Sequence, residues 1–116
     1  MKAEGVLMEV GVLLKEEGWG KGELKDTKGK RCVLGAINKV VSIEDEFGVE
    51  YPSWLLKDGI LRKKCQLSLA ASRLLLKRIG RYEMGLRPLE VENMVTAWND
   101  SLEKEQEVID VCLGKK

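Results

Sequence analysis

Apolar side chains recur at helical spacing along most of this chain of 116 residues, and no other feature of the sequence constrains the fold as strongly. Apolar residues three or four positions apart lie on one side of a helix, where they can pack against the rest of a protein. The first such stripe precedes Gly18, a residue that can end a helix in the left-handed conformation. This stripe consists of Val6, Leu7, Val10, Leu13 and Leu14.

Glycine and proline separate the helices predicted further along the chain. A long helix over residues 61–79 is closed by Gly80, and Pro88 suits the first turn of the helix that follows and continues to Trp98. Asp100 and Glu103 form a capping box, which predicts that the last helix begins there. The remaining helical segments are predicted at residues 32–41 and, as short turns, at residues 43–47 and 54–57.

These segments predict a mainly α fold, a compact bundle of five or six helices in a single domain over residues 1–116. Asp26 and Gly29 lie at the two ends of a four-residue turn, so a small β-hairpin near residues 23–32 is the most β-structure we expect. The core is predicted from the apolar stripe of each segment. Its members are Leu13, Leu34, Leu74, Trp98 and Ile109.

The chain contains no histidine and three widely spaced cysteines, and this composition excludes several classes of site. Without histidine, Ser-His-Asp and Cys-His catalysis cannot occur within one chain. Three cysteines without a Cys-x-x-Cys pair support neither a disulfide framework nor a zinc site, so we expect reduced thiols, no metal and no cofactor. No segment has the length and apolarity of a membrane span, and the first residues do not resemble a signal peptide. We therefore expect a cytoplasmic protein without membrane contact.

Basic residues are concentrated in the middle of the chain, although the formal net charge is only +1. Residues 51–100 carry 9 basic and 5 acidic side chains, an excess too small for duplex nucleic acid but sufficient for one phosphorylated ligand. Arginine binds phosphate with two parallel hydrogen bonds, a geometry that lysine cannot reproduce. The predicted ligand-binding residues lie on one side of the long helix, whose alternative role is a solvated surface. They are Arg62, Arg73, Lys77 and Arg81.

A second basic segment precedes the helix at residues 32–41, where helix amides could contribute to anion binding. Its acidic neighbours Glu23 and Asp26 also suit an ordinary solvated turn, so both interpretations remain open. The basic members of this segment are Lys21, Lys25, Lys28, Lys30 and Arg31.

Cys32, Asn99 and Asp100 are the candidate catalytic residues. A cysteine beside Lys30 and Arg31 at a helix start has the surroundings that lower a thiol pKa, but it also suits tight helix packing. Asn99 and Asp100 could assist such a thiol, and they could equally cap the last helix. Cys65 and Cys112 lie within predicted helices, where a structural role is expected.

Two motifs, GW-x-x-G-x-L-x-D-x-x-G-x-x-C-x-x-GAI over residues 18–37 and WND followed by EVI over residues 98–109, resemble those of a family of small uncharacterised bacterial and phage proteins. Residues 42–89 carry no matching motif. The resemblance implies a fold and a bacterial or phage setting, and it transfers no catalytic residue.

The function that we expect is that of a non-enzymatic accessory protein of a bacterium or phage. It would sequester a small nucleotide-like ligand or block a host defence protein, as a homo-oligomer in the cytoplasm, which is the host cytoplasm if a phage encodes it. Two alternatives remain: a thiol-dependent enzyme that uses Cys32, and a protein-interaction module without a ligand.

Overall fold

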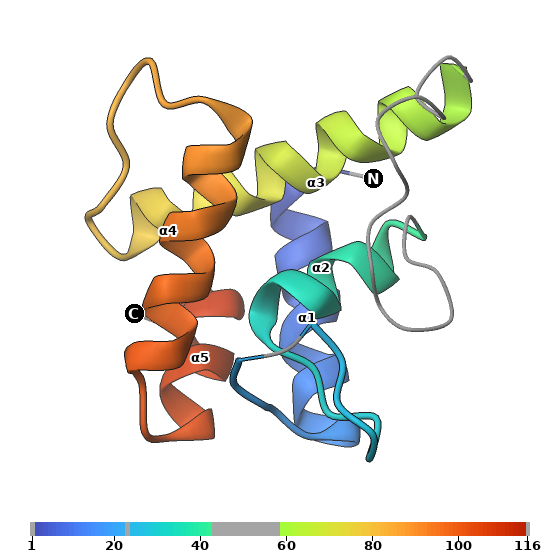
Figure 1. Ribbon diagram of the computed structural model, residues 1–116, viewed down its shortest axis with the longest axis vertical. Coiled ribbons are helices and arrows are strands. Elements are labelled where there is room, and N and C mark those ends of the chain that lie inside the picture. The colour runs from blue at the N-terminus through green and yellow to red at the C-terminus, as the bar shows by residue number, and fades with distance from the viewer. Residues whose placement is uncertain (1, 23, 43–58, 116) are drawn as a thin grey trace.

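The computed structural model describes residues 2–22, 24–42 and 59–115, and over this part of the chain the protein is built from helices (Figure 1). The predicted mainly α class is therefore confirmed, and the number of described helices agrees with the predicted five or six. The predicted turns at residues 43–47 and 54–57 lie outside the described residues. The helices are α1 (Ala3–Glu17), α2 (Val33–Val40), α3 (Gly59–Arg78), α4 (Pro88–Ser101) and α5 (Glu105–Cys112).

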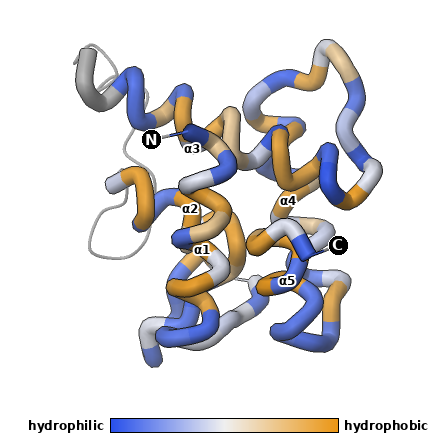
Figure 2. Tube along the Cα trace, turned by 180° about the vertical axis from the view of Figure 1, so that it is seen from behind, coloured by the Kyte–Doolittle hydropathy of each residue, from blue (hydrophilic) through white to orange (hydrophobic). Residues whose placement is uncertain are grey.

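Helix α3 contacts each of the four other described helices, and α1 contacts α2, α3 and α5. In Figure 1, α4 and α5 lie on one side of α1, while α2 lies against the same helix nearer the viewer. Figure 2 shows apolar positions along all five helices, alternating with hydrophilic ones. Each helix therefore contributes one apolar side to a shared core. None of these helices is both long enough and apolar enough to cross a membrane.

The first helix ends where the sequence predicts. Gly18 adopts a positive φ of 95°, which only glycine tolerates easily, and its amide donates a hydrogen bond of 2.9 Å to the Leu14 carbonyl. The predicted stripe is buried at Val6, Leu7, Val10 and Leu14, while Leu13 lies at its edge and is half-buried.

The predicted core is confirmed for Leu34, Trp98 and Ile109, which are between 4% and 6% exposed. It is wrong for Leu13 and Leu74, which are only partly buried and pack against the outside of the core. In α3 the residue that follows the predicted Leu74 is buried in its place. The most buried members of α3 are Ser68, Ala71, Ser72, Leu75 and Leu76.

The predicted hairpin is present only as a turn with isolated bridges. The amide of Gly29 donates to the Asp26 carbonyl at 3.1 Å, as expected for a four-residue turn, and Asp26 Oδ1 accepts from the amides of Lys28 and Lys30. Lys25 and Arg31 form one antiparallel bridge, and no strand is assigned in the described part of the chain. The aspartate thus orders the turn without a β-ladder.

The predicted start of the last helix is wrong. Helix α4 begins at Pro88 as predicted but continues through Asn99 and Asp100 to Ser101, and α5 begins only at Glu105, with Lys104 as its N-cap residue. Asp100 therefore caps nothing in α5. Its side chain and that of Asn99 are engaged with a different part of the chain, described below.

Candidate functional site

The loop between α1 and α2, residues 18–32, is fixed to α4 by one asparagine side chain. Asn99 is fully buried, and its Oδ1 accepts hydrogen bonds from Trp19 Nε1 at 2.7 Å and from the Val33 amide at 2.9 Å. Its Nδ2 donates to the Gly20 carbonyl at 3.1 Å. One side chain of α4 thereby holds the beginning of the loop and the first residue of α2.

Asp100 continues this connection at the surface. Its Oδ1 accepts from the Gly22 amide at 3.0 Å and from Asn99 Nδ2 at 3.1 Å. The two motif regions, about 80 residues apart in sequence, therefore meet in space. The sequence shows that Trp19, Asn99 and Asp100 belong to motifs, but the interpretation of the two polar residues as helix caps was wrong.

Cys32 and Asp100 line a small pocket of about 260 Å³, which we call the cysteine pocket. Its other lining residues are Gly22, Leu24 and Thr96. The candidate catalytic residues are thus close together, but their surroundings do not favour a nucleophile. Burial raises the pKa of the Cys32 thiol, and the negative charge of Asp100 raises it further, although Cys32 Sγ accepts a hydrogen bond from the Gly35 amide. The thiol is therefore protonated at neutral pH.

A second pocket, of about 390 Å³, lies beside the turn at residues 26–29, and we call it the basic pocket. Arg31 is the most buried residue of its wall, with 4% of its surface exposed. Four cationic side chains and one carboxylate line this pocket, a net charge of +3. The lining residues are Glu17, Lys25, Lys28, Gly29, Arg31 and Lys39.

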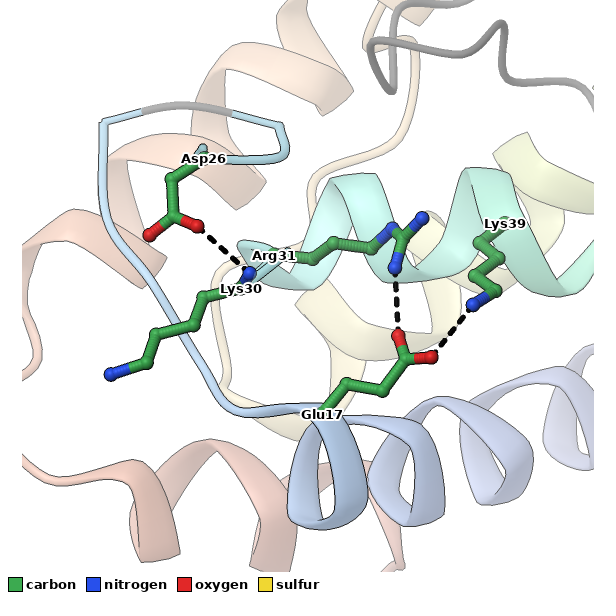
Figure 3. Close-up of polar contacts among 5 residues, drawn as sticks. All are labelled: Glu17, Asp26, Lys30, Arg31 and Lys39. Carbon is green, nitrogen blue, oxygen red and sulfur yellow. Dashed lines mark hydrogen bonds and ion pairs between the residues drawn. The ribbon is translucent and has the colours of Figure 1, made fainter. Parts of the chain in front are cut away.

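Glu17 joins two cations, one that precedes α2 and one near the end of this helix (Figure 3). Its Oε2 lies 2.7 Å from Arg31 Nη1, and its Oε1 lies 2.8 Å from Lys39 Nζ. The hydrogen bond from Lys39 lowers the pKa of Glu17, and the charges of Lys39 and Arg31 lower it further. The carboxylate is therefore ionised at neutral pH.

Some basic residues of the segment before α2 line the basic pocket, and the others lie on the outer surface. Lys25, Lys28 and Arg31 line the basic pocket. Lys21 instead places its Nζ over the Trp19 ring, 5.5 Å from the ring centre. The Lys30 side chain points away from Glu17 (Figure 3). Sequence reasoning missed Glu17 and Lys39, because they are separate from the basic segment and have the ordinary charges of helix ends.

The predicted ligand-binding residues of α3 line neither of these two pockets. Arg62, Arg73 and Lys77 lie on the helix, whereas Arg81 follows it, beyond the left-handed turn at Gly80. Lys77 Nζ lies 5.0 Å from the centre of the Tyr82 ring. The Nε of Arg73 is buried and has no hydrogen-bond partner within the described part of the chain.

The other two cysteines lie apart from both pockets. Cys65 is half-buried on α3, and burial raises the pKa of Cys112 to about 12. Within residues 2–22, 24–42 and 59–115, no group of three or more cysteine, aspartate or glutamate side chains is arranged to hold a metal ion.

Comparison with known proteins identifies the family of this chain. The sequence model of DUF6197, a family of unknown function, matches residues 1–113. The chain belongs to the DUF6197 family. No curated protein and no solved structure matches it. The resemblance expected from the two motifs is thus confirmed at the level of the family, and the DUF6197 match includes both pockets and the Asn99 connection.

Proposed function

We propose that this protein is a non-enzymatic binding protein that holds a small phosphorylated, nucleotide-like ligand in the basic pocket. The observation that carries the proposal is the placement of Arg31. This side chain is almost completely buried in the wall of a pocket that three lysines also line. A buried guanidinium is expensive to desolvate, and its planar fork matches the oxygens of a phosphate.

The size and charge of the basic pocket suit this ligand class. A volume of about 390 Å³ lies near the lower end of the range for small-molecule sites. The positive charge comes from residues that the turn at Asp26 and the start of α2 hold in place. In a turn that is merely solvated, the cationic side chains would extend into water. Lys30 is exposed in this way, whereas the side chain of Arg31 is buried in the protein.

The α3 side chains offer a second position for the same ligand. The observation in its favour is the buried Nε of Arg73, a donor without a partner among the described residues. Arg73 and Lys77 lie four residues apart, so their side chains project from the same side of α3. We rank this position second, because Lys77 is engaged with Tyr82.

The proposed setting is that of a bacterial or phage accessory protein. Sequestering a nucleotide-like signal or blocking a host defence protein are both consistent with a binding protein, and we propose a homo-oligomer in the cytoplasm. A thiol-dependent enzyme is less well supported, because Cys32 is buried and its pKa is raised.

Calorimetric titration with a panel of linear and cyclic nucleotides tests the proposal and separates the two positions. If the ligand occupies the basic pocket, Lys28→Ala should weaken binding by about one to two powers of ten, the effect of losing a charge-assisted hydrogen bond. Lys104→Ala removes the same charge at the exposed start of α5 and serves as the control.

If the ligand instead binds at the α3 position, the same titration should respond to substitution of Arg73. Arg73→Ala would then weaken binding by about one to two powers of ten. Arg73→Lys would restore only part of the lost affinity, because the charge returns without the planar fork. If the wild-type protein binds none of the panel, the ligand proposal is wrong and blocking of a host protein becomes the leading function.

A further inference from the structure

The carboxylate of Glu17 occupies the position that an anionic ligand would take in the basic pocket. Its two oxygens each contact a different cation, Arg31 at 2.7 Å and Lys39 at 2.8 Å, as two oxygens of one phosphate could (Figure 3). Arg31 is 4% exposed and its Nη1 donates to Glu17 Oε2, so a ligand that binds this nitrogen competes with Glu17.

We infer that the ligand's phosphate displaces the Glu17 carboxylate from Arg31 and Lys39, so that Glu17 acts as an internal competitor that lowers the affinity of the basic pocket for phosphorylated ligands. This inference rests on the proposed function, because it requires that the basic pocket binds a phosphorylated ligand. Glu17 therefore limits the affinity of the basic pocket.

The charge of a ligand determines how well it competes with Glu17. A terminal phosphomonoester carries close to two negative charges at neutral pH, whereas a cyclic phosphodiester carries one. Glu17 also carries one, because its pKa is lowered by Lys39 and Arg31. A cyclic nucleotide would therefore replace one single charge by another at these two cations and gain little. A terminal phosphate adds a charge and a further acceptor oxygen, so it gains from the exchange.

Glu17→Gln provides a direct test, because the amide keeps an acceptor oxygen for Arg31 but removes the competing charge. Glu16→Gln is the matched control. It changes the net charge by the same amount at the adjacent, exposed position of α1, which lines neither pocket described above. The probes are adenosine 5′-monophosphate and its 3′,5′-cyclic counterpart, titrated calorimetrically into the full chain.

In the wild-type protein and in Glu16→Gln, the linear nucleotide should bind about tenfold more tightly than the cyclic one, the effect of one charge-assisted contact. Glu17→Gln should tighten the binding of both nucleotides by about tenfold and leave the ratio between them unchanged, because both ligands displace the same carboxylate. Glu17→Ala, which also lacks the amide, should tighten the binding of both to a similar extent, and this variant controls for an effect of the glutamine itself.

The outcomes separate this inference from the proposed function. If both Glu17 variants bind the nucleotides no more tightly than the wild-type protein does, the role of Glu17 is overturned while ligand binding stands. Binding that Lys28→Ala and Lys39→Ala leave unchanged also overturns it, because the ligand is then elsewhere. If only the Glu17 variants bind, the competition is supported and the proposed function of the native protein fails. If no variant binds either probe, both are overturned.

Discussion

Every hydrogen-bonding position of the Asn99 side-chain amide has a partner within the protein. Its oxygen accepts two hydrogen bonds, from Trp19 and Val33, and its nitrogen donates two, to Gly20 and Asp100. An asparagine amide offers two donors and two acceptor positions, so none is left over. This one residue therefore fixes the loop that carries both pockets.

Replacing Asn99 should be costly because Asn99 itself and its partner Val33 are buried. Asn99→Ala leaves the Trp19 and Val33 N–H groups without their acceptor, and we expect a loss of about 3 kcal/mol in the free energy of unfolding. Urea denaturation followed by circular dichroism measures it. Asn93→Ala on the exposed side of the same helix should change stability by no more than about 0.5 kcal/mol. Equal stability of the two variants would contradict the role given to Asn99.

Cys32 should react slowly with iodoacetamide at pH 7. Burial and Asp100 raise the thiol pKa, so the reactive thiolate is scarce below that pKa and its fraction increases as the pH rises toward it. Alkylation should therefore continue to accelerate between pH 7 and pH 9, with Cys65 modified before Cys32. Peptide mapping by mass spectrometry at timed intervals distinguishes the sites. Rapid modification of Cys32 alone at pH 7 would instead favour the thiol-enzyme alternative.

At the scale of elements, α2 and the preceding loop approach each other unusually closely. Gly35 lies in the first turn of α2, and a Cβ at this position would overlap the backbone carbonyl of Leu24. Glycine is required here by space rather than by backbone conformation. The close approach brings Leu24 to the wall of the cysteine pocket, where Cys32 also lies.

Gly35→Ala should therefore separate the loop from α2. Because the obstacle is backbone and cannot rotate aside, we expect a loss of about 3 kcal/mol or more, at the upper end for an overpacked site. Gly20→Ala is the matched control in the same loop, since its Cβ would meet only ordinary contacts at 3.5 Å and beyond. Thermal unfolding of both variants measures the difference. A Gly35→Ala protein as stable as Gly20→Ala would show that the loop moves easily.

The sequence predicts most helix boundaries well because local signals determine them. Gly18 ends α1, Pro88 begins α4, and Gly80 follows α3, each through a backbone property of the residue itself. The end of α4 could not be predicted in this way. Asn99 and Asp100 favour caps when considered alone, and only their long-range partners keep them inside a helix.

At the scale of the whole molecule, α3 is the element against which all the others pack. Leu75 and Leu76 are fully buried on its inner side, while the adjacent Leu74 lies at the edge. The helical period alone cannot distinguish these neighbouring positions, because a run of three leucines covers most of the circumference of the helix. The sequence therefore predicts a long helix with an apolar side here, but not which of its leucines is the most buried.

Leu75→Ala should reduce the free energy of unfolding by about 2–5 kcal/mol, the cost of a buried cavity. Leu74→Ala should cost less, because part of that side chain is already in contact with solvent. Leu89→Ala is the control, since Leu89 is 66% exposed and should change stability by no more than about 0.5 kcal/mol. Denaturant titrations of the three variants test the order. A cost for Leu74→Ala larger than for Leu75→Ala would mean that the helix is rotated.

The candidate site was only partly predictable for a similar reason. Lys25, Lys28 and Arg31 lie in one basic segment, so the sequence identifies them as a possible anion site. Glu17 and Lys39 join them only because α1 and α2 pack together, which no local pattern records. The arginines of α3 share a helical side, but spacing cannot show whether that side borders a pocket.

The connection between Trp19 and Asn99 also sets an order of events during synthesis. The two residues are separated by 80 positions, so closing this contact requires most of the chain. At the stage of synthesis when α1, the loop and α2 exist but α4 does not, Asn99 is still missing. The amide of Val33 and the indole N–H of Trp19 then lack their acceptor, Asn99 Oδ1. A nascent chain therefore cannot assemble the loop in its final form until Asn99 has emerged, so the loop residues of both pockets reach their final positions only after α4 has been synthesised.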